Sequence, residues 1–169
     1  ILNNKWLSKK FVVTEIVVLI LAGIGLYFSG YFTKEELNGN DKESIINTIH
    51  SLEGYKEPPV NILDVRDFDE QRVVSFLSGT SPAYILFEKN KDENYKWYSV
   101  GVDREGNFEQ FFPAPKDVSP KLLFITNGEN KIAKWEVKIN EKKVHQEFKT
   151  NEPSVTWFEL PETNETSYT

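Results

Sequence analysis

Four acidic side chains near an expected turn are the residues best suited to chemistry: Asp64, Asp67, Asp69 and Glu70. A hard cation such as Ca²⁺ binds six to eight oxygen atoms, and a turn can bring several carboxylates together. However, their spacing is not that of a calcium-binding loop, and no glycine allows the sharp bend that such a loop needs. We interpret them as weak metal candidates in a solvated turn, whose substitution by asparagine should not lower the melting temperature.

The other reactive groups form no recognisable site. His50 and His145 are far apart in the chain, and residues 103–107 offer even fewer metal ligands than the first cluster. Cysteine is absent, which excludes disulfides, thiolate zinc sites and thiol nucleophiles. The chain also lacks a nucleophile elbow, a phosphate-binding loop and a dinucleotide fingerprint. The sequence therefore predicts no catalytic residue and no cofactor, and we expect a protein that is not an enzyme.

Aromatic residues are concentrated in the middle of the chain. Exposed on a sheet, such rings would bind a peptide or a glycan. In a domain of this size we instead expect them to form the core. The residues concerned are Tyr84, Phe87, Tyr95, Trp97, Tyr98, Phe108, Phe111 and Phe112.

The stretch 11–32 is almost entirely apolar and contains one charged residue, Glu15. A helix of about 20 apolar residues spans a bilayer. Lys5, Lys9 and Lys10 precede the stretch, and most of the 26 acidic residues follow it. Because basic flanks stay on the cytoplasmic side, the sequence predicts a single-pass protein in the cell membrane with its carboxyl-terminal part outside. A cleaved signal peptide is the alternative interpretation.

The net negative charge of the chain argues against nucleic acid as a partner. The net charge of the chain is −6, and an acidic domain outside the membrane is a poor ligand for nucleic acid. The expected partners are the lipid bilayer and a protein of the cell envelope.

A polar neck, 33–40, is expected to join the span to a first folded module, 41–113. Its helix is predicted over 41–53, with Asn40 as the cap and Glu43 completing a capping box. Apolar residues then recur with a period of two, which is typical of strands. The predicted strands, 60–66, 72–77, 83–88, 95–103 and 108–112, would form a five-stranded antiparallel sheet with the helix on one face.

A proline-rich connector leads to a second module, 114–169, with strands at 121–126, 132–139, 144–149 and 155–160. Asn127-Gly128 predicts a tight hairpin between the first two of these strands, because both residues tolerate positive φ. Four strands without a helix indicate a small sandwich-like module that would need further strands beyond residue 169. The predicted fold class is α+β: a transmembrane helix at residues 1–32 with its cytoplasmic tip, a helix on an antiparallel sheet, and a small all-β module.

Two segments, ILDVRDFDEQRVVSFL (62–77) and ILFEKNKDENYKWYSVGVDREGNFEQF (85–111), resemble uncharacterised membrane-anchored proteins of spore-forming Gram-positive bacteria. The resemblance implies a location and a fold but no chemistry. We expect a non-catalytic binding or regulatory module of the cell envelope. The alternatives are an accessory subunit of a larger membrane complex and a cell-envelope enzyme.

Overall fold

The computed structural model describes residues 37–116, 119–139 and 142–160. The predicted membrane-spanning stretch 11–32 and the first part of the predicted neck lie outside these residues. In the part of the chain that is described, no helix is both long and apolar enough to cross a membrane.

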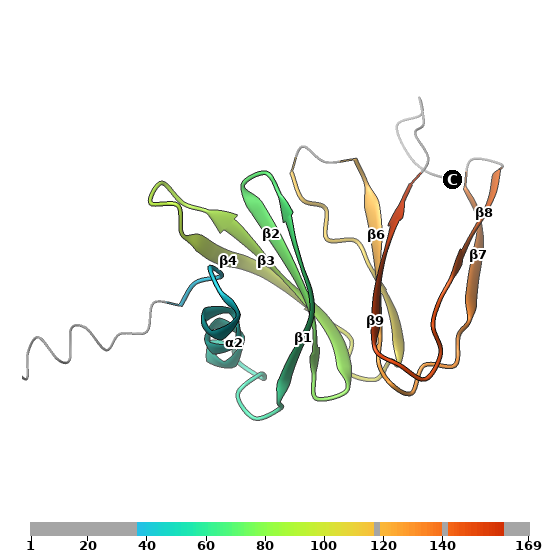
Figure 1. The fold of residues 1–169 in the computed structure, drawn as a ribbon, viewed down its shortest axis with the longest axis horizontal. Helices are drawn as coiled ribbons and strands as arrows, with labels where there is room; N and C mark the ends of the chain where they lie inside the picture. Colours follow the sequence, from blue (N-terminus) through green and yellow to red (C-terminus); the bar gives the residue numbers. More distant parts are fainter. Residues whose placement is uncertain (1–36, 117–118, 140–141, 161–169) are drawn as a thin grey trace, which may run out of the picture. The chain divides into compact units, whose positions relative to one another are not determined.

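The described residues contain one helix and nine strands (Figure 1). Four strands form an antiparallel sheet, sheet A, in the order β1-β2-β3-β4, and three form sheet B in the order β5-β6-β9. The remaining two strands, β7 and β8, form hairpin C. The elements are α2 (Lys42–Ser51), β1 (Val60–Phe68), β2 (Gln71–Ser78), β3 (Ser81–Lys89), β4 (Tyr95–Val102), β5 (Phe108–Phe111), β6 (Lys121–Thr126), β7 (Lys134–Ile139), β8 (Lys142–Glu147) and β9 (Ser154–Glu159).

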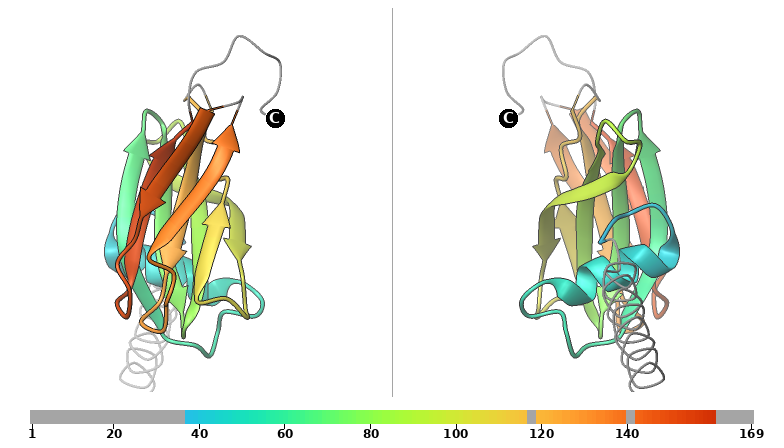
Figure 2. Two further views of the ribbon diagram at one scale, coloured as in Figure 1. Left: turned by 90° about the vertical axis from the view of Figure 1, so that its right-hand side faces the viewer. Right: turned by 90° about the vertical axis from the view of Figure 1, so that its left-hand side faces the viewer.

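Apolar side chains join these elements into four successive layers. Ile49 of α2 belongs to the same core cluster as the strands of sheet A, and Figure 2 shows α2 lying across that sheet. On the opposite face of sheet A, Leu86 shares a core with Ile125 of sheet B. On the far face of sheet B, Phe124 packs against Trp135 of hairpin C. The order of layers is helix, sheet A, sheet B and hairpin C.

Sheet B is an inner layer, and its central strand, β6, is therefore covered on both faces. In β6, Leu122 and Phe124 face hairpin C, whereas Leu123 and Ile125 face sheet A. All four side chains are buried. A strand that is covered on both faces has no polar side, so it appears in the sequence as an uninterrupted apolar run.

The predicted α+β class is wrong, because the structure is mostly β, with 51% strand and one short helix in the part described. Three of the four layers consist of strands, and the single helix covers only one outer face. The predicted five-stranded first sheet is also not observed. Residues Phe108–Phe111 (β5) pair with β6 instead of joining β4, so the chain passes from one sheet to the other after β4.

The predicted hairpin at Asn127-Gly128 is not observed either. A two-residue turn of that kind needs positive φ at both positions, and neither residue adopts it. The Asn127 side chain instead donates hydrogen bonds to Thr80 O (2.8 Å) and Asn107 Oδ1 (2.9 Å), which tie the end of β6 to two other turns. The chain then leaves sheet B, and β7 pairs with β8.

The helix begins one residue later than the sequence indicated. Asp41 is the cap, and its carboxylate accepts from the backbone N–H of Ser44 (2.9 Å). Asn40, the predicted cap, accepts from the backbone N–H of Tyr95 (2.9 Å) instead. A tertiary contact to a distant strand has therefore replaced the local capping box.

A carboxyl pair lies where the chain crosses between the sheets. Asp103 accepts from the backbone N–H groups of Glu105 (2.8 Å) and Gly106 (3.2 Å), and these bonds hold its pKa below the usual value. Burial, and then the hydrogen bond and negative charge of Asp103, raise the pKa of Glu109. Of the two carboxyl groups, Glu109 is therefore the one whose pKa is raised in the folded chain.

We expect Glu109→Gln to raise the free energy of unfolding at neutral pH and to flatten its pH dependence. Between the ordinary glutamate pKa and the raised one, the folded chain holds a proton that the unfolded chain releases, so stability falls as pH rises through this window. Glutamine keeps an N–H donor for Asp103 and does not ionise. Urea unfolding between about pH 4 and 8 measures the slope, and Glu105→Gln in the same turn is the control. Equal slopes in the two variants would contradict the assignment.

Candidate functional site

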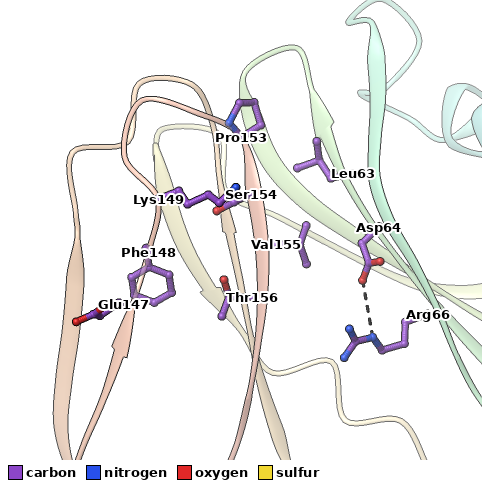
Figure 3. A pocket seen from close by; sticks show the side chains of 10 residues that line it. All are labelled: Leu63, Asp64, Arg66, Glu147, Phe148, Lys149, Pro153, Ser154, Val155 and Thr156. Atoms are coloured by element: carbon purple, nitrogen blue, oxygen red, sulfur yellow. Dashed lines mark ion pairs between the residues drawn. The ribbon is translucent and has the colours of Figure 1, made fainter.

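A groove of about 520 Å³ lies beside β9. It lies between β1, the edge strand of sheet A, and the connection from β8 to β9 (Figure 3). Both apolar and charged side chains line it: Leu63, Asp64, Arg66, Glu147, Phe148, Lys149, Pro153, Ser154, Val155 and Thr156. In Figure 3 the β1 residues lie on one side of β9, and Glu147 and Phe148 lie on the other.

Trp157 of β9 holds β1 and β9 together next to the groove. Its indole Nε1 donates to Asp64 Oδ2 (3.2 Å), and its ring contacts Phe68 edge-on at 5.4 Å between centroids. The guanidinium of Arg66 lies over the same ring at 5.2 Å and within 3.9 Å of the Asp64 carboxylate. These contacts position Asp64 and Arg66 as a fixed wall of the groove.

Along β9, successive residues direct their backbone N–H and C=O groups alternately toward β6 and toward the free edge of the sheet. The N–H of Leu160 donates to Pro120 O (3.2 Å), so these residues form a hydrogen-bonded pair that extends the β6–β9 ladder. Hydrogen-bonded and non-hydrogen-bonded pairs alternate along an antiparallel ladder. Thr156 therefore directs its N–H and C=O groups at β6, whereas Val155 and Trp157 direct theirs away from the sheet.

The other edges of sheets A and B are protected against pairing. A β-bulge interrupts β1 at Leu63, and another interrupts β4 at Tyr98. The edge strand β5 has only four residues. Bulges and short edge strands are the usual means of blocking edge-to-edge association. By contrast, β9 pairs with β6 without any register shift over six residues.

The bulge in β1 also shapes the groove. An extra residue in a strand changes the direction in which its side chain points. The extra residue here is Leu63, which packs against the core between sheets A and B and lines the groove as well. The same irregularity thus protects the edge of β1 and supplies apolar surface beside β9.

The acidic cluster of the sequence does not converge on one point. Asp64 lies in the groove and contacts Trp157, whereas Asp67 forms an ion pair with Arg72. Asp69 lies in the two-residue turn between β1 and β2, where its φ is 49°. Within the described residues no group of three or more acidic or histidine side chains is placed to hold a metal ion. The two histidines lie in different layers, His50 in α2 and His145 in hairpin C.

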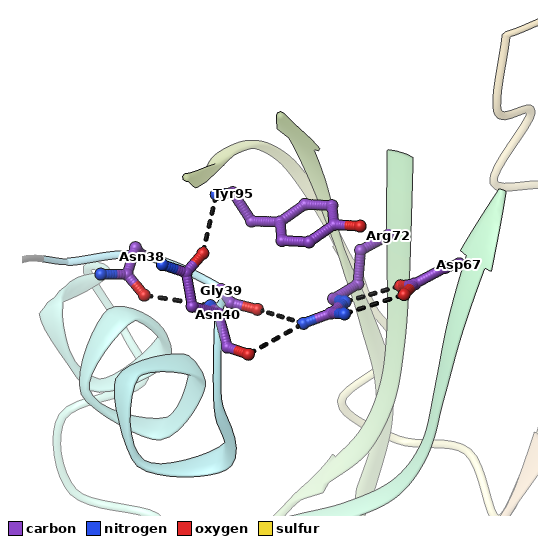
Figure 4. Close-up of polar contacts among 6 residues, drawn as sticks. All are labelled: Asn38, Gly39, Asn40, Asp67, Arg72 and Tyr95. Atoms are coloured by element: carbon purple, nitrogen blue, oxygen red, sulfur yellow. Dashed lines mark hydrogen bonds and ion pairs between the residues drawn. The ribbon is translucent and has the colours of Figure 1, made fainter. Parts of the chain in front are cut away.

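Arg72 is a structural residue that the sequence interpretation missed (Figure 4). Its guanidinium donates to both carboxylate oxygens of Asp67 (2.6 and 2.8 Å) and to the backbone oxygens of Gly39 (2.7 Å) and Asn40 (3.2 Å). It also lies over the ring of Tyr95 at 4.1 Å. The hydrogen bond from Arg72 lowers the pKa of Asp67. Because the Asp67 side chain is 48% exposed and solvent screens the pair, we expect Asp67→Asn to lower the free energy of unfolding by less than about 1 kcal/mol, whereas the sequence alone indicated no loss.

The segment Asn38 to Asn40, the end of the predicted polar neck, is held against α2 and sheet A. The N–H of Gly39 donates to Tyr95 O (2.8 Å), and Thr48 Oγ1 donates to Asn38 O (3.0 Å). A Cβ on Gly39 would lie 2.5 Å from the ring of Phe87, so only glycine fits this close approach. We call this segment with Arg72, Asp67 and Tyr95 the clamp.

Comparison with family models, curated proteins and solved structures found no match to this chain. The resemblance to membrane-anchored proteins of Gram-positive bacteria therefore stays a prediction from the sequence. Any functional assignment depends on the geometry of the groove and of β9.

Proposed function

We propose that the protein is a non-catalytic binding module that takes up an extended peptide segment as an additional strand along β9. In this mode of recognition, the backbone of the peptide pairs with an exposed sheet edge and pockets beside the edge receive its side chains. The observation that carries the proposal is the regular, unprotected edge of β9 at the floor of a groove, whereas the other edges of sheets A and B are bulged or short.

The backbone groups of Val155 and Trp157 supply the hydrogen bonds. Each residue offers one N–H and one C=O on the side away from β6. A net contribution of about 0.5–1.5 kcal/mol is usual for one such hydrogen bond. Four such bonds contribute about 2–6 kcal/mol in total. Because association itself costs several kcal/mol, burial of side chains in the groove has to supply the rest of the binding free energy.

The charged side chains of the groove support binding over catalysis. Asp64 is engaged by Trp157 and Arg66, and Lys149 pairs with Glu152 at 2.8 Å. A general acid or base needs a position from which it reaches the substrate, whereas these groups hold one another in place. They act as the walls of a groove in this proposal.

The place where the module works remains a prediction from the sequence. The apolar stretch 11–32 and the acidic residues after it favour a membrane-anchored module that faces the outside of the cell. The partner in this proposal is accordingly another protein of the cell envelope.

Substitution of a single residue tests the proposal. Val155→Pro removes an N–H that points away from β6, so the ladder between β6 and β9 stays intact, as is usual for proline on an edge strand. Proline also places a ring where an incoming strand would pair. Peptides that bind the unsubstituted chain in detergent are first selected from a random library. We expect their affinity for the Val155→Pro variant to be at least about tenfold lower than for the unsubstituted chain.

Val155→Thr is the matched control, because threonine has nearly the same shape and keeps the N–H. It should retain binding, and both variants should melt close to the unsubstituted chain. Peptides that bind the chain and its Val155→Pro variant equally well would overturn the proposal, as would a library from which no peptide is selected.

A further inference from the structure

A strand added to β9 would place one of its side chains directly beside Trp157. The backbone N–H and C=O groups of Val155 and Trp157 point away from β6, and both side chains pack against the core between sheets A and B. Residues that pair directly across two strands carry their side chains on the same face of the sheet. The ligand residue that pairs with Trp157 would therefore direct its side chain to the side of β1.

Arg66 of β1 is the basic group that this side chain would meet. Its guanidinium lies over the ring of Trp157 at 5.2 Å from the centroid, and Arg66 lines the groove. The Arg66 side chain is 46% exposed, so water hydrates it in the free chain. A ligand strand that pairs with Trp157 would displace part of this water.

The N–H groups of Arg66 have no hydrogen-bond acceptor in the part of the chain that the structure describes. Asp64 Oδ2 is 3.9 Å from Arg66 Nε, which is beyond hydrogen-bond distance. The same oxygen accepts from Trp157 Nε1 at 3.2 Å. Asp64 and Trp157 thus hold the guanidinium in place and leave its five N–H donors for a ligand.

The other charged residues of the lining are less well placed to contact an added strand. Lys149 forms an ion pair with Glu152 at 2.8 Å. Glu147 is exposed, and Figure 3 shows it on the far side of Phe148 from β9. Arg66 is therefore the charged group of the lining whose donors remain open to a strand beside β9.

From these observations, and resting on the function proposed above, we infer that the ligand segment carries an aspartate or a glutamate at the position that pairs with Trp157. A carboxylate accepts two parallel N–H bonds from a planar guanidinium, which fixes its orientation. It also replaces the water that the strand removes from Arg66, whereas an apolar side chain would leave a charged group without its hydration. Arg66 then selects the ligand and sets the register of its pairing with β9.

The test uses the peptides selected from the random library for binding to the unsubstituted chain in detergent. They are synthesised with blocked ends, so that every carboxylate belongs to a side chain. We expect an acidic residue at one fixed position of these peptides. Its replacement by asparagine or glutamine should weaken binding to the unsubstituted chain at least about tenfold. The same replacement should have little effect on binding to the Arg66→Gln variant.

Arg104→Gln is the matched control, because it removes the same charge from an exposed arginine outside the lining of the groove. The peptides should bind this variant as they bind the unsubstituted chain. Arg66→Lys should recover only part of the affinity, since an ammonium group does not offer paired N–H donors in a plane.

The outcomes separate this inference from the proposed function. If the peptides lose binding to Val155→Pro but carry no fixed acidic residue, or bind Arg66→Gln as tightly as the unsubstituted chain, strand addition stands and the inference is wrong. Selected peptides that share a basic residue and lose binding to Glu147→Gln would overturn the inference in the same way. If the peptides bind Val155→Pro and the unsubstituted chain equally, strand addition at β9 is wrong and the inference falls with it.

Discussion

Phe124→Ala is expected to lower the free energy of unfolding by about 3–5 kcal/mol, the usual cost of removing a fully buried phenylalanine. Phe124 is 0% exposed and lies at the centre of the core between sheet B and hairpin C. Its ring contacts those of Phe108, Trp135 and Phe148 at centroid distances of 5.7, 5.2 and 5.0 Å. Total stability is usually about 5–15 kcal/mol, so the loss would be a large part of it.

The reason for the size of this effect is the dependence of hairpin C on sheet B. An isolated two-stranded hairpin is marginally stable in water and needs a further apolar layer to pack against. Phe124 provides the centre of that layer. Urea unfolding followed by tryptophan fluorescence measures the change, and Trp135 reports from hairpin C itself.

Phe112→Ala is the matched control for this prediction. Phe112 is 52% exposed and follows directly after β5. Its removal should change the free energy of unfolding by no more than about 0.5 kcal/mol. Similar effects of the two substitutions would mean that sheet B is not the inner layer.

Arg72→Ala should lower the free energy of unfolding by about 2–3 kcal/mol. The Arg72 side chain is 15% exposed, and its removal leaves the backbone oxygens of Gly39 and Asn40 without their charged donor. The Tyr95 ring loses its cation. The Asp67 carboxylate is 48% exposed, so solvent screens its ion pair and we assign little of the loss to that pair.

The pH dependence of the same variant follows from Asp67. Arg72 lowers the pKa of Asp67 in the folded chain, so this carboxylate contributes stability above its unfolded pKa. That contribution is lost as pH falls through the lowered, folded pKa. In Arg72→Ala the acid limb of the stability profile should therefore become shallower.

Three comparisons make the prediction for the clamp specific. Arg72→Lys should recover little, because an ammonium group cannot bridge a carboxylate and two carbonyl oxygens as a planar guanidinium does. Arg66→Ala, which also removes an arginine from an aromatic ring, should cost less than about 1 kcal/mol because Arg66 is half exposed. Hydrogen exchange at the amides of Gly39 and Tyr95 should accelerate in Arg72→Ala alone. Unchanged exchange there would show that Arg72 does not hold the segment.

Local patterns in the sequence determined the individual elements well. The sequence predicted a helix over 41–53, and α2 spans Lys42–Ser51. The period of two predicted the strands, including the hairpin of β1 and β2 across its acidic turn. These features depend on backbone propensities and on neighbours a few residues away.

The pairing of strands was decided by the tertiary structure. β5 follows β4 directly in the chain but pairs with β6. An apolar run such as that of β6 shows that both faces are covered, and it carries no information about which elements cover them. The predicted α+β class failed for this reason, since only the packing showed that sheet B lies between two other β layers.

The candidate site depends even more on tertiary structure. Asp64 stood out in the sequence as an acidic residue, yet its role follows from Trp157, which is distant in the chain and adjacent in space. The sequence placed Asp67 near Arg72 across the hairpin but gave no signal for the other partners of Arg72, because Gly39 and Tyr95 belong to other segments. The free edge of β9 was invisible for the same physical reason: a sequence predicts that a strand forms, but only the folded sheet determines which side of that strand remains unpaired.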